Sequence, residues 1–244
     1  MAFELEVLKS RLAINGLTIE YVQETGSTNA DLLAIPGVPE GTVLIAGAQS
    51  AGRGRNSRAF ASPEGGLYMS VMLHPQSVAE ALGITPLAAV AVARAIEEQF
   101  GLNPGIKWVN DILIDGKKVC GILAEAVQGE RLNVVLGIGV NVTQPEGGFS
   151  EGLRDIAGAL FENPPEHARE KLAAAILNGL FARNFDTHSE YVRRSAVLGR
   201  TVMVNCAGDI YQARAVAIDE RFRLVVERGA ERIHLDSGEV SIKL

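Results

Sequence analysis

The stretch Gln49-Ser-Ala-Gly-Arg-Gly-Arg-Asn-Ser-Arg58, followed by Gly65-Gly-Leu-Tyr-Met-Ser-Val-Met-Leu73, carries the most information in this chain. Glycine lets a backbone approach a ligand closely, and each arginine offers a planar fork of donors that matches phosphate and carboxylate oxygens. The second part alternates apolar residues, which predicts a half-buried strand. The pattern predicts a loop that leads into a strand and closes over an anion. Taken alone, the first ten residues would suit a flexible basic surface loop equally well.

The composition favours a soluble protein. With 244 residues, of which 47% are hydrophobic, the chain can form one large domain or a medium and a small one. No apolar run approaches the ~18 residues of a membrane span, and the first residues do not look like a signal peptide. Two distant cysteines, Cys120 and Cys206, indicate a reducing compartment. We therefore expect a cytoplasmic protein. Its net charge of −6 argues against sequence-independent nucleic-acid binding.

Three further blocks keep a fixed order with the arginine loop. Glu24-Thr-Gly-Ser-Thr-Asn-Ala-Asp31 precedes it, and Ile106-Lys-Trp-Val-Asn-Asp-Ile-Leu-Ile-Asp-Gly-Lys-Lys-Val-Cys-Gly-Ile-Leu-Ala-Glu125 and Gly137-Ile-Gly-Val-Asn-Val142 follow it. Together the four blocks resemble the catalytic domain of biotin–protein ligases. That family carries a Ser-Thr-Asn start, a Gly-Arg-Gly-Arg loop, a Lys-Trp-Pro-Asn-Asp stretch, a Lys before Gly-Ile-Leu and a Gly-x-Gly-x-Asn strand. The resemblance runs from about residue 26 to residue 142.

The expected fold class is α+β. The resemblance implies a mixed, mainly antiparallel sheet with helices packed on one side, as in the class II synthetase-like biotin–lipoyl ligase fold. After residue 199, short strand patterns separated by Gly and Asp turns predict a small β barrel, and the family likewise ends in an SH3-like β domain. We expect a catalytic domain over 1–195 and a C-terminal β domain over 196–244.

Local patterns predict the individual elements. The predicted helices cover 2–12, 27–33, 86–100 and 165–186, and the third begins at a proline. The predicted strands of the first domain cover 17–22, 42–48, 66–73, 106–113, 118–127 and 132–142. The turn Asp115-Gly116 predicts a hairpin between the strands on either side of it.

The resemblance implies a reaction in two steps. The biotin carboxylate attacks the α-phosphorus of ATP, which gives biotinyl-5′-AMP and pyrophosphate, and a lysine of a biotin carboxyl carrier domain then attacks this anhydride. The first step brings two anions together, so positive charge and oriented donors are required. Arg53, Arg55 and Lys118 match the family residues that meet this requirement and are the predicted catalytic residues. Lys117, adjacent on a strand, should point to the opposite face.

The other predicted site residues come from the same four blocks. The expected biotin-binding residues are Ser27, Thr28, Asn29, Gln49, Gly52, Arg53, Gly54, Arg55, Lys118, Gly121 and Gly139. The expected ATP- and adenylate-binding residues are Arg53, Arg55, Phe60, Lys107, Trp108, Asn110 and Asn141. Asp111 is the candidate Mg²⁺ ligand, because that ion favours a few carboxylate oxygens together with water and phosphate.

Several of these residues also have purely structural explanations. Ser27 or Thr28 suits a helix N-cap. Trp108 is either a core residue, which we favour, or a wall beside the adenine. Lys107 either reaches the triphosphate or lies on the surface of the sheet, and Asp111 either binds metal or fixes a turn.

Three departures from the family pattern affect affinity more than reaction type. Val109 replaces the usual proline of Lys-Trp-Pro-Asn-Asp, and Asn56-Ser57 stands where Arg-Gly is common. Phe60 stands where tryptophan is usual, which keeps an aromatic wall but reduces its stacking area.

Two alternative functions remain at this level: a lipoyl or octanoyl transferase of the same fold, and a non-catalytic biotin sensor. Lipoyl and octanoyl transferases lack the arginine loop and the Lys-Trp-x-Asn-Asp block that this chain carries. Some family members also carry an N-terminal DNA-binding domain, for which the 26 residues before Ser27 leave too little room. We expect the form without that domain, with biotin, ATP and Mg²⁺ as ligands, a carrier domain as partner, no nucleic acid, no membrane, and a homodimer as the oligomeric state.

Overall fold

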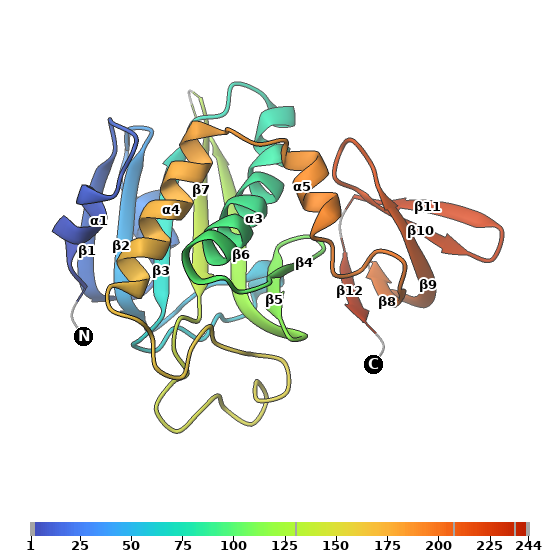
Figure 1. Cartoon of the computed structure of the whole chain (residues 1–244). Helices are drawn as coiled ribbons and strands as arrows, with labels where there is room; N and C mark the ends of the chain where they lie inside the picture. Colours follow the sequence, from blue (N-terminus) through green and yellow to red (C-terminus); the bar gives the residue numbers. More distant parts are fainter. Residues whose placement is uncertain (1–2, 130, 207, 237, 243–244) are drawn as a thin grey trace.

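The structure, a computed structural model, describes residues 3–129, 131–206, 208–236 and 238–242. These residues form two β-sheets, a larger one covered by helices and a smaller one at the C-terminal end (Figure 1). The larger sheet has seven strands in the order β1-β2-β3-β7-β6-β5-β4. Their bounds are β1 Thr18–Thr25, β2 Thr42–Gln49, β3 Leu67–Leu73, β4 Gly105–Lys107, β5 Asp111–Ile114, β6 Lys117–Gln128 and β7 Leu132–Val140.

The larger sheet is mixed, as predicted. β1 pairs with β2 in parallel, and every other neighbouring pair in it is antiparallel. β5 and β6 form the expected hairpin, because Asp115 and Gly116 take positive φ angles of 50° and 78° and close a tight turn. This hairpin sets the register of β6, which carries several of the predicted site residues.

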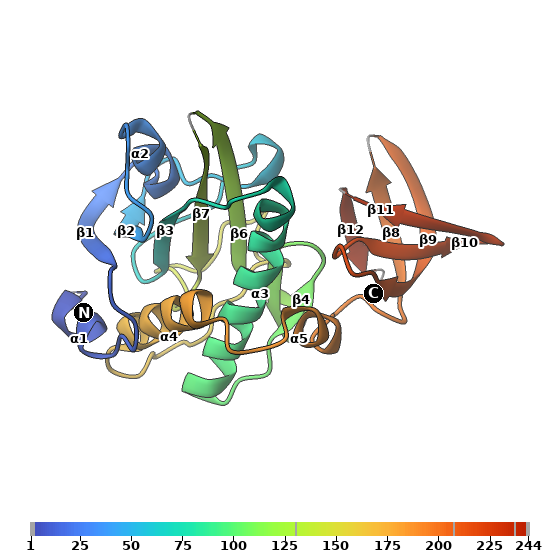
Figure 2. The same cartoon turned by 90° about the horizontal axis from the view of Figure 1, so that it is seen from above.

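Helices cover both faces of this sheet, which corrects the expectation of helices on one side. α1 (Leu5–Ser10), α3 (Val78–Phe100) and α4 (Ala168–Ala182) lie on one face, and α2 (Thr28–Ala34) lies on the other (Figure 2). Leu32 of α2 packs in a small second core, which also contains Leu44, Met72 and Val135. For the same reason all seven residues of β3 are buried, whereas the alternating pattern predicted a half-buried strand.

The start of α3 also differs from the prediction, because the helix begins at Val78 and Pro86 lies inside it. Ser77 Oγ accepts a hydrogen bond from the Glu80 amide at 3.1 Å, and Glu80 Oε2 accepts one from the Gln76 amide at 2.8 Å. These two hydrogen bonds cap the N-terminus and start the helix upstream. Pro86 cannot donate to the carbonyl of Leu82, and Leu82 is 73% exposed, so water can bind there.

By length and composition alone, α3 is apolar and long enough to cross a membrane. The expectation that no apolar run approaches that length overlooked this helix. In the folded chain more than half of its apolar window is buried. It contacts α4, α5 (Thr187–Arg193) and strands of the sheet. α3 is therefore the central core helix of the larger unit.

Two other predicted elements are divided in the structure. The predicted strand 106–113 forms β4 and β5, which pair antiparallel around a turn that contains a cis peptide between Trp108 and Val109. The predicted helix 165–186 ends at Ala182, and α5 follows with Asp186 as its N-cap. The Asp186 carboxylate accepts hydrogen bonds from the amides of His188 and Ser189, which starts this second helix.

The short strand patterns after residue 199 form a second sheet of five strands, all antiparallel, in the order β11-β10-β9-β8-β12. Residues 207, 237, 243 and 244 of the predicted domain lie outside the described residues. The strands are β8 Thr201–Cys206, β9 Asp209–Ile218, β10 Leu224–Arg228, β11 Glu231–Leu235 and β12 Glu239–Ile242. A domain boundary at 195/196 stays a prediction.

Candidate active site

The candidate site lies on the face of the larger sheet that carries α2. On this face β6 and β7 present glycine, because Gly121 and Gly139 are cross-strand partners. A Cβ atom at Gly139 would lie 2.5 Å from Cε1 of Phe60, and one at Gly121 would lie 2.9 Å from its Cε2. The Phe60 ring therefore rests against a floor that only glycine leaves open.

The arginine loop folds back on itself as a short hairpin over this floor. Isolated bridges join Gln49 to Ser62 and Arg53 to Ala59. The Phe60 amide donates to the Gly52 carbonyl at 2.9 Å. A side chain at Gly52 would collide with the Phe60 carbonyl and with Ser62 Oγ, so this position requires glycine.

The two predicted loop arginines contact different segments beneath them. Arg53 Nη2 lies 3.0 Å from Glu125 Oε1 of β6, and the arginine side chain is 48% exposed. Arg55 Nη1 donates to Asn110 Oδ1 at 3.3 Å, and Asn110 Nδ2 donates to the Ile122 carbonyl at 2.7 Å. Both guanidinium groups thus lie on the site face, next to β6 and the turn before β5.

Lys118 also faces the site. Its Nζ lies 2.6 Å from Asp111 Oδ1 and 5.8 Å from the centre of the Phe60 ring. The register between β5 and β6 shifts after Ile112, and this bulge lets Lys118 and Gly121, three residues apart, share one face. Lys117 turns the other way, and its Nζ donates to the Arg154 carbonyl at 3.3 Å.

A network of amides and hydroxyls lies beside the cations, at the N-terminus of α2. Ser27 caps the helix, with its Oγ 3.5 Å from the Ala30 amide. Gln49 Oε1 accepts from the Thr28 amide at 2.9 Å, and its Nε2 donates to Ser62 Oγ at 2.9 Å. Ser27, Thr28, Asn29 and Gln49, predicted as one group, are neighbours in the structure.

Two residues of this network were missed by sequence reasoning, Ser70 and Glu125. Ser70 Oγ lies 2.6 Å from Thr28 Oγ1 and donates to Asn29 Oδ1 at 2.6 Å, and Asn29 Nδ2 donates to Glu125 Oε2 at 2.8 Å. Gly137 makes room for Asn29, since a Cβ there would lie 2.9 Å from its Cγ. A fully buried serine in an otherwise apolar strand, and an acid ending the block after Lys118, were the available signals.

Three predicted nucleotide-binding residues lie less directly in the site. Trp108 is only 4% exposed, and its Nε1 donates at 2.9 Å to the Phe222 carbonyl, in the connection between β9 and β10. This agrees with the core alternative. Asn141 is buried and its Nδ2 donates to the Gly158 carbonyl at 2.9 Å. Lys107 ends β4, in register with Asp111.

The turn at Trp108 is braced from behind. Tyr191 of α5 donates to the Val109 carbonyl at 2.9 Å, and burial raises the pKa of Tyr191, so it stays a neutral donor. The Tyr191 and Phe222 rings meet edge to face at 5.5 Å. Asn110 and Asp111 are therefore held by contacts with α5 and the C-terminal sheet.

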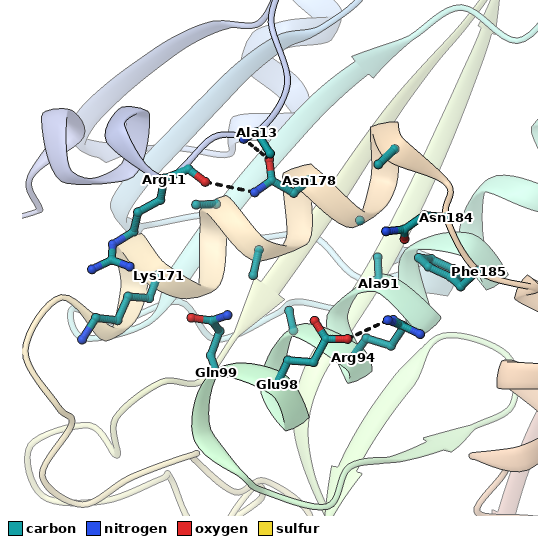
Figure 3. Close-up of a pocket in the computed structure, with 15 residues that line it drawn as sticks. Arg11, Ala13, Ala91, Arg94, Glu98, Gln99, Lys171, Asn178, Asn184 and Phe185 are labelled. Atoms are coloured by element: carbon teal, nitrogen blue, oxygen red, sulfur yellow. Dashed lines mark hydrogen bonds and ion pairs between the residues drawn. The ribbon is translucent and has the colours of Figure 1, made fainter.

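A separate cavity of about 310 Å³ lies among α3, α4 and the chain after α1, on the other face of the sheet (Figure 3). Arg94 pairs with Glu98 at its rim, and Asn178 bonds the Ala13 amide and the Arg11 carbonyl. These contacts fasten the N-terminal segment to α4. None of the predicted site residues lines this cavity.

Family models match most of the chain. Residues 19–141 match the Biotin/lipoate A/B protein ligase family, and residues 197–243 match the Biotin protein ligase C terminal domain. The chain belongs to the biotin/lipoate protein ligase family. The strands that form the glycine floor and the arginine loop all lie within the first match.

Named relatives of this ligase family support the assignment. The chain is 36% identical over 241 residues to the Biotin--[acetyl-CoA-carboxylase] ligase of Mycobacterium tuberculosis, covering 91% of this chain and 88% of that protein. It is 43% identical over 157 residues to the Bifunctional ligase/repressor BirA of Bacillus subtilis. That match covers 63% of this chain and 48% of BirA, so the chain spans about half the length of that curated relative.

The fold agrees with a solved ligase structure. The biotin protein ligase from Aquifex aeolicus in complex with biotin and ATP aligns with a TM-score of 0.78 at 26% identity, over 93% of this chain and 98% of that one. The expected ligase fold is therefore confirmed.

Proposed function

We propose that this chain is an ATP-dependent biotin–protein ligase that makes biotinyl-5′-AMP and transfers the biotinyl group to a carrier lysine. The observation that carries this proposal is the meeting of Arg53, Arg55 and Lys118 on one glycine-floored face, beside the hydroxyl–amide network of α2. The relative of known structure that aligns over 93% of the chain binds biotin and ATP, which supports the same assignment.

The network beside α2 suits a neutral ring with both N–H donors and a carbonyl acceptor, such as the ureido ring of biotin. Thr28 and Ser70 have one hydroxyl proton each, but three contacts use their oxygens. The two hydroxyls contact each other, Ser70 Oγ contacts Asn29 Oδ1, and Thr28 Oγ1 contacts Gln49 Oε1. The network therefore has more acceptor positions than protons. Donors of a ligand can use the remaining lone pairs.

The cations suit the first chemical step. A carboxylate oxygen of biotin attacks the α-phosphorus, and the bond from that phosphorus to the bridging oxygen of pyrophosphate breaks. Lys118 carries a compact ammonium that can follow both anions as the geometry changes, and Arg53 and Arg55 offer planar donors to the phosphate oxygens. In the second step the carrier amine attacks the carbonyl carbon, AMP leaves, and the amine loses a proton.

Mg²⁺ would be held mainly by the nucleotide. Among the residues that the structure describes, no group of three His, Cys, Asp or Glu side chains could hold a metal. Asp111 offers one carboxylate, which contacts Lys118. A single carboxylate together with ATP phosphates and water fits the way proteins bind Mg²⁺, which would supply charge neutralisation on the phosphates.

The partners follow from the reaction and the surface. The acceptor is a carrier domain of a biotin-dependent carboxylase, and the net charge of −6 supports the absence of a nucleic-acid partner. In the described part of the chain β5 pairs with β6 only as far as Gly121, so the outer side of 123–127 has no strand beside it. That edge supports a homodimer through strand pairing, which sedimentation would test.

The deciding experiment is biotin-dependent release of pyrophosphate from ATP, followed by transfer to a carrier domain. We expect pyrophosphate release with biotin and ATP, and covalent biotin on the carrier lysine. Absence of release, together with transfer of a lipoyl or octanoyl group from an acyl donor to the acceptor lysine, would favour the transferase alternative. Biotin binding without any release would favour the sensor.

The arginine loop should respond to ligand. Its hairpin is held by few backbone hydrogen bonds, among them Phe60 to Gly52 and Gly54 to the Arg58 carbonyl at 2.7 Å. We expect amides within 52–62 to exchange readily in the free protein and to gain protection when biotin or its adenylate binds, because the ligand adds contacts to both arginines. Hydrogen exchange measures this, and β3 serves as the unchanging reference. Equal protection of the loop in both states would mean that it is preformed.

A further inference from the structure

We propose that Glu125 is a positioning residue that orients the Asn29 amide and holds Arg53 in place over the glycine floor. This inference rests on the proposed function, since it concerns how the same site binds biotin. Glu125 lies on β6 four residues after Gly121, on the same face of the strand. Its side chain is largely covered, with 21% exposed.

The two carboxylate oxygens of Glu125 have different partners. Oε1 lies 3.0 Å from Arg53 Nη2, and Oε2 accepts from Asn29 Nδ2 at 2.8 Å. Arg53 belongs to the loop and Asn29 to α2, so this one side chain joins the two elements that enclose the site. Bonds to a carboxylate are stronger than bonds between neutral groups.

The chemistry of a carboxylate decides which way the Asn29 amide points. An ionised carboxylate can only accept hydrogen bonds, so Asn29 must present its NH₂ group to Glu125. Its carbonyl oxygen is then directed to Ser70, which donates to it at 2.6 Å. The Ser70 proton is thereby committed, and Thr28 and Gln49 complete the network toward the loop. Glu125 therefore sets the donor–acceptor direction from Asn29 to Ser70.

A glutamine at this position cannot keep both contacts. If its Oε1 accepts from Asn29, its NH₂ group faces the Arg53 guanidinium, and two donors meet. If its Oε1 accepts from Arg53, its NH₂ group faces the Asn29 NH₂ group, which must then turn and lose the bond from Ser70. Glu125→Gln, nearly equal in size, therefore tests charge and direction and leaves packing almost unchanged.

We expect E125Q to raise the KM for biotin about ten- to hundredfold, the range for loss of a hydrogen bond to a charged group, with a smaller effect on kcat. Direct titration with biotin should show the same loss in Kd. The matched control is E227Q, on the C-terminal sheet. It removes the carboxylate whose Oε1 lies 2.9 Å from Arg232 Nε, and it should leave the KM and the Kd for biotin unchanged. An E125Q value within twofold of the wild-type KM and Kd would overturn the proposal.

An exchange of the two groups gives a second, independent test. In the double variant N29D/E125Q, the carboxylate introduced by N29D accepts from Ser70 and from the glutamine NH₂ group, and the glutamine carbonyl accepts from Arg53, so all three contacts return. We expect this double variant to bind biotin at least fivefold more tightly than E125Q. If the affinity losses of N29D and E125Q simply add in the double variant, the positioning role is contradicted. This comparison holds even where E125Q alone folds poorly. Wild-type protein that releases no pyrophosphate with biotin would instead refute the proposed function itself.

Discussion

Lys118→Ala is expected to slow formation of biotinyl-5′-AMP by about 10²–10³-fold, the usual cost of removing one preorganised donor from a charged transition state. The Lys118 ammonium lies on the site face, between the Asp111 carboxylate and the Phe60 ring. In the proposed reaction it is the group that contacts the biotin carboxylate and the α-phosphate together. Single-turnover measurement of adenylate formation, with enzyme in excess over labelled ATP, reports this step separately from transfer.

The adjacent lysine is the matched control for this variant. Lys117 carries the same charge, but its ammonium contacts the Arg154 carbonyl on the other side of the strand. Lys117→Ala should therefore change the rate by less than about threefold, because it removes only a distant, screened charge. If Lys117→Ala were the more damaging variant, the assignment of Lys118 as the catalytic lysine would be wrong.

Trp108→Ala is expected to lower the free energy of unfolding by about 3–5 kcal/mol, as for other large buried aromatic residues. Trp108 is almost fully buried, and its indole N–H donates to the Phe222 carbonyl at the junction with the C-terminal sheet. Removing the ring leaves a cavity and an unpaired carbonyl together. Because Trp108 is the single tryptophan of the chain, urea unfolding should be followed by circular dichroism.

A conservative variant separates the two parts of this effect. Trp108→Phe keeps an aromatic ring and removes the N–H donor, so it should cost about 1–3 kcal/mol, the penalty for leaving the Phe222 carbonyl unsatisfied. An alanine variant with unchanged stability and a raised KM for ATP would show instead that Trp108 is a wall of the nucleotide site.

Short-range rules predict much of this fold from the residues alone. Short apolar runs between turn residues placed β2, β3, β6 and β7 to within a few residues, because the apolar residues of a strand are contiguous or alternating in sequence. Asp115-Gly116 located the hairpin, since few other residues tolerate two consecutive positive φ angles. Ser27 began α2 as its N-cap. The order of the four blocks was sufficient to indicate the family.

Other features of the fold depend on contacts between segments that are distant in sequence, which local patterns do not encode. The 106–113 run reads as one strand, but Trp108 and Val109 are held in a turn by Phe222 and Tyr191, which lie far away in sequence. α2 covers the second face of the sheet, so β3 is buried on both sides although its pattern resembles that of a half-exposed strand.

The same holds for the candidate site. Arg53, Arg55 and Lys118 were recognisable from their motifs, but their partners Glu125, Asn110 and Asp111 depend on strand register and on the bulge after Ile112. The only local signal for Glu125 is an acid at the end of the Lys118 block, because its role arises from Asn29 and Arg53, which approach it from two other elements. Motifs specify which groups are available, whereas the pairing of strands specifies which of them meet, because that pairing depends on burial summed over the whole core.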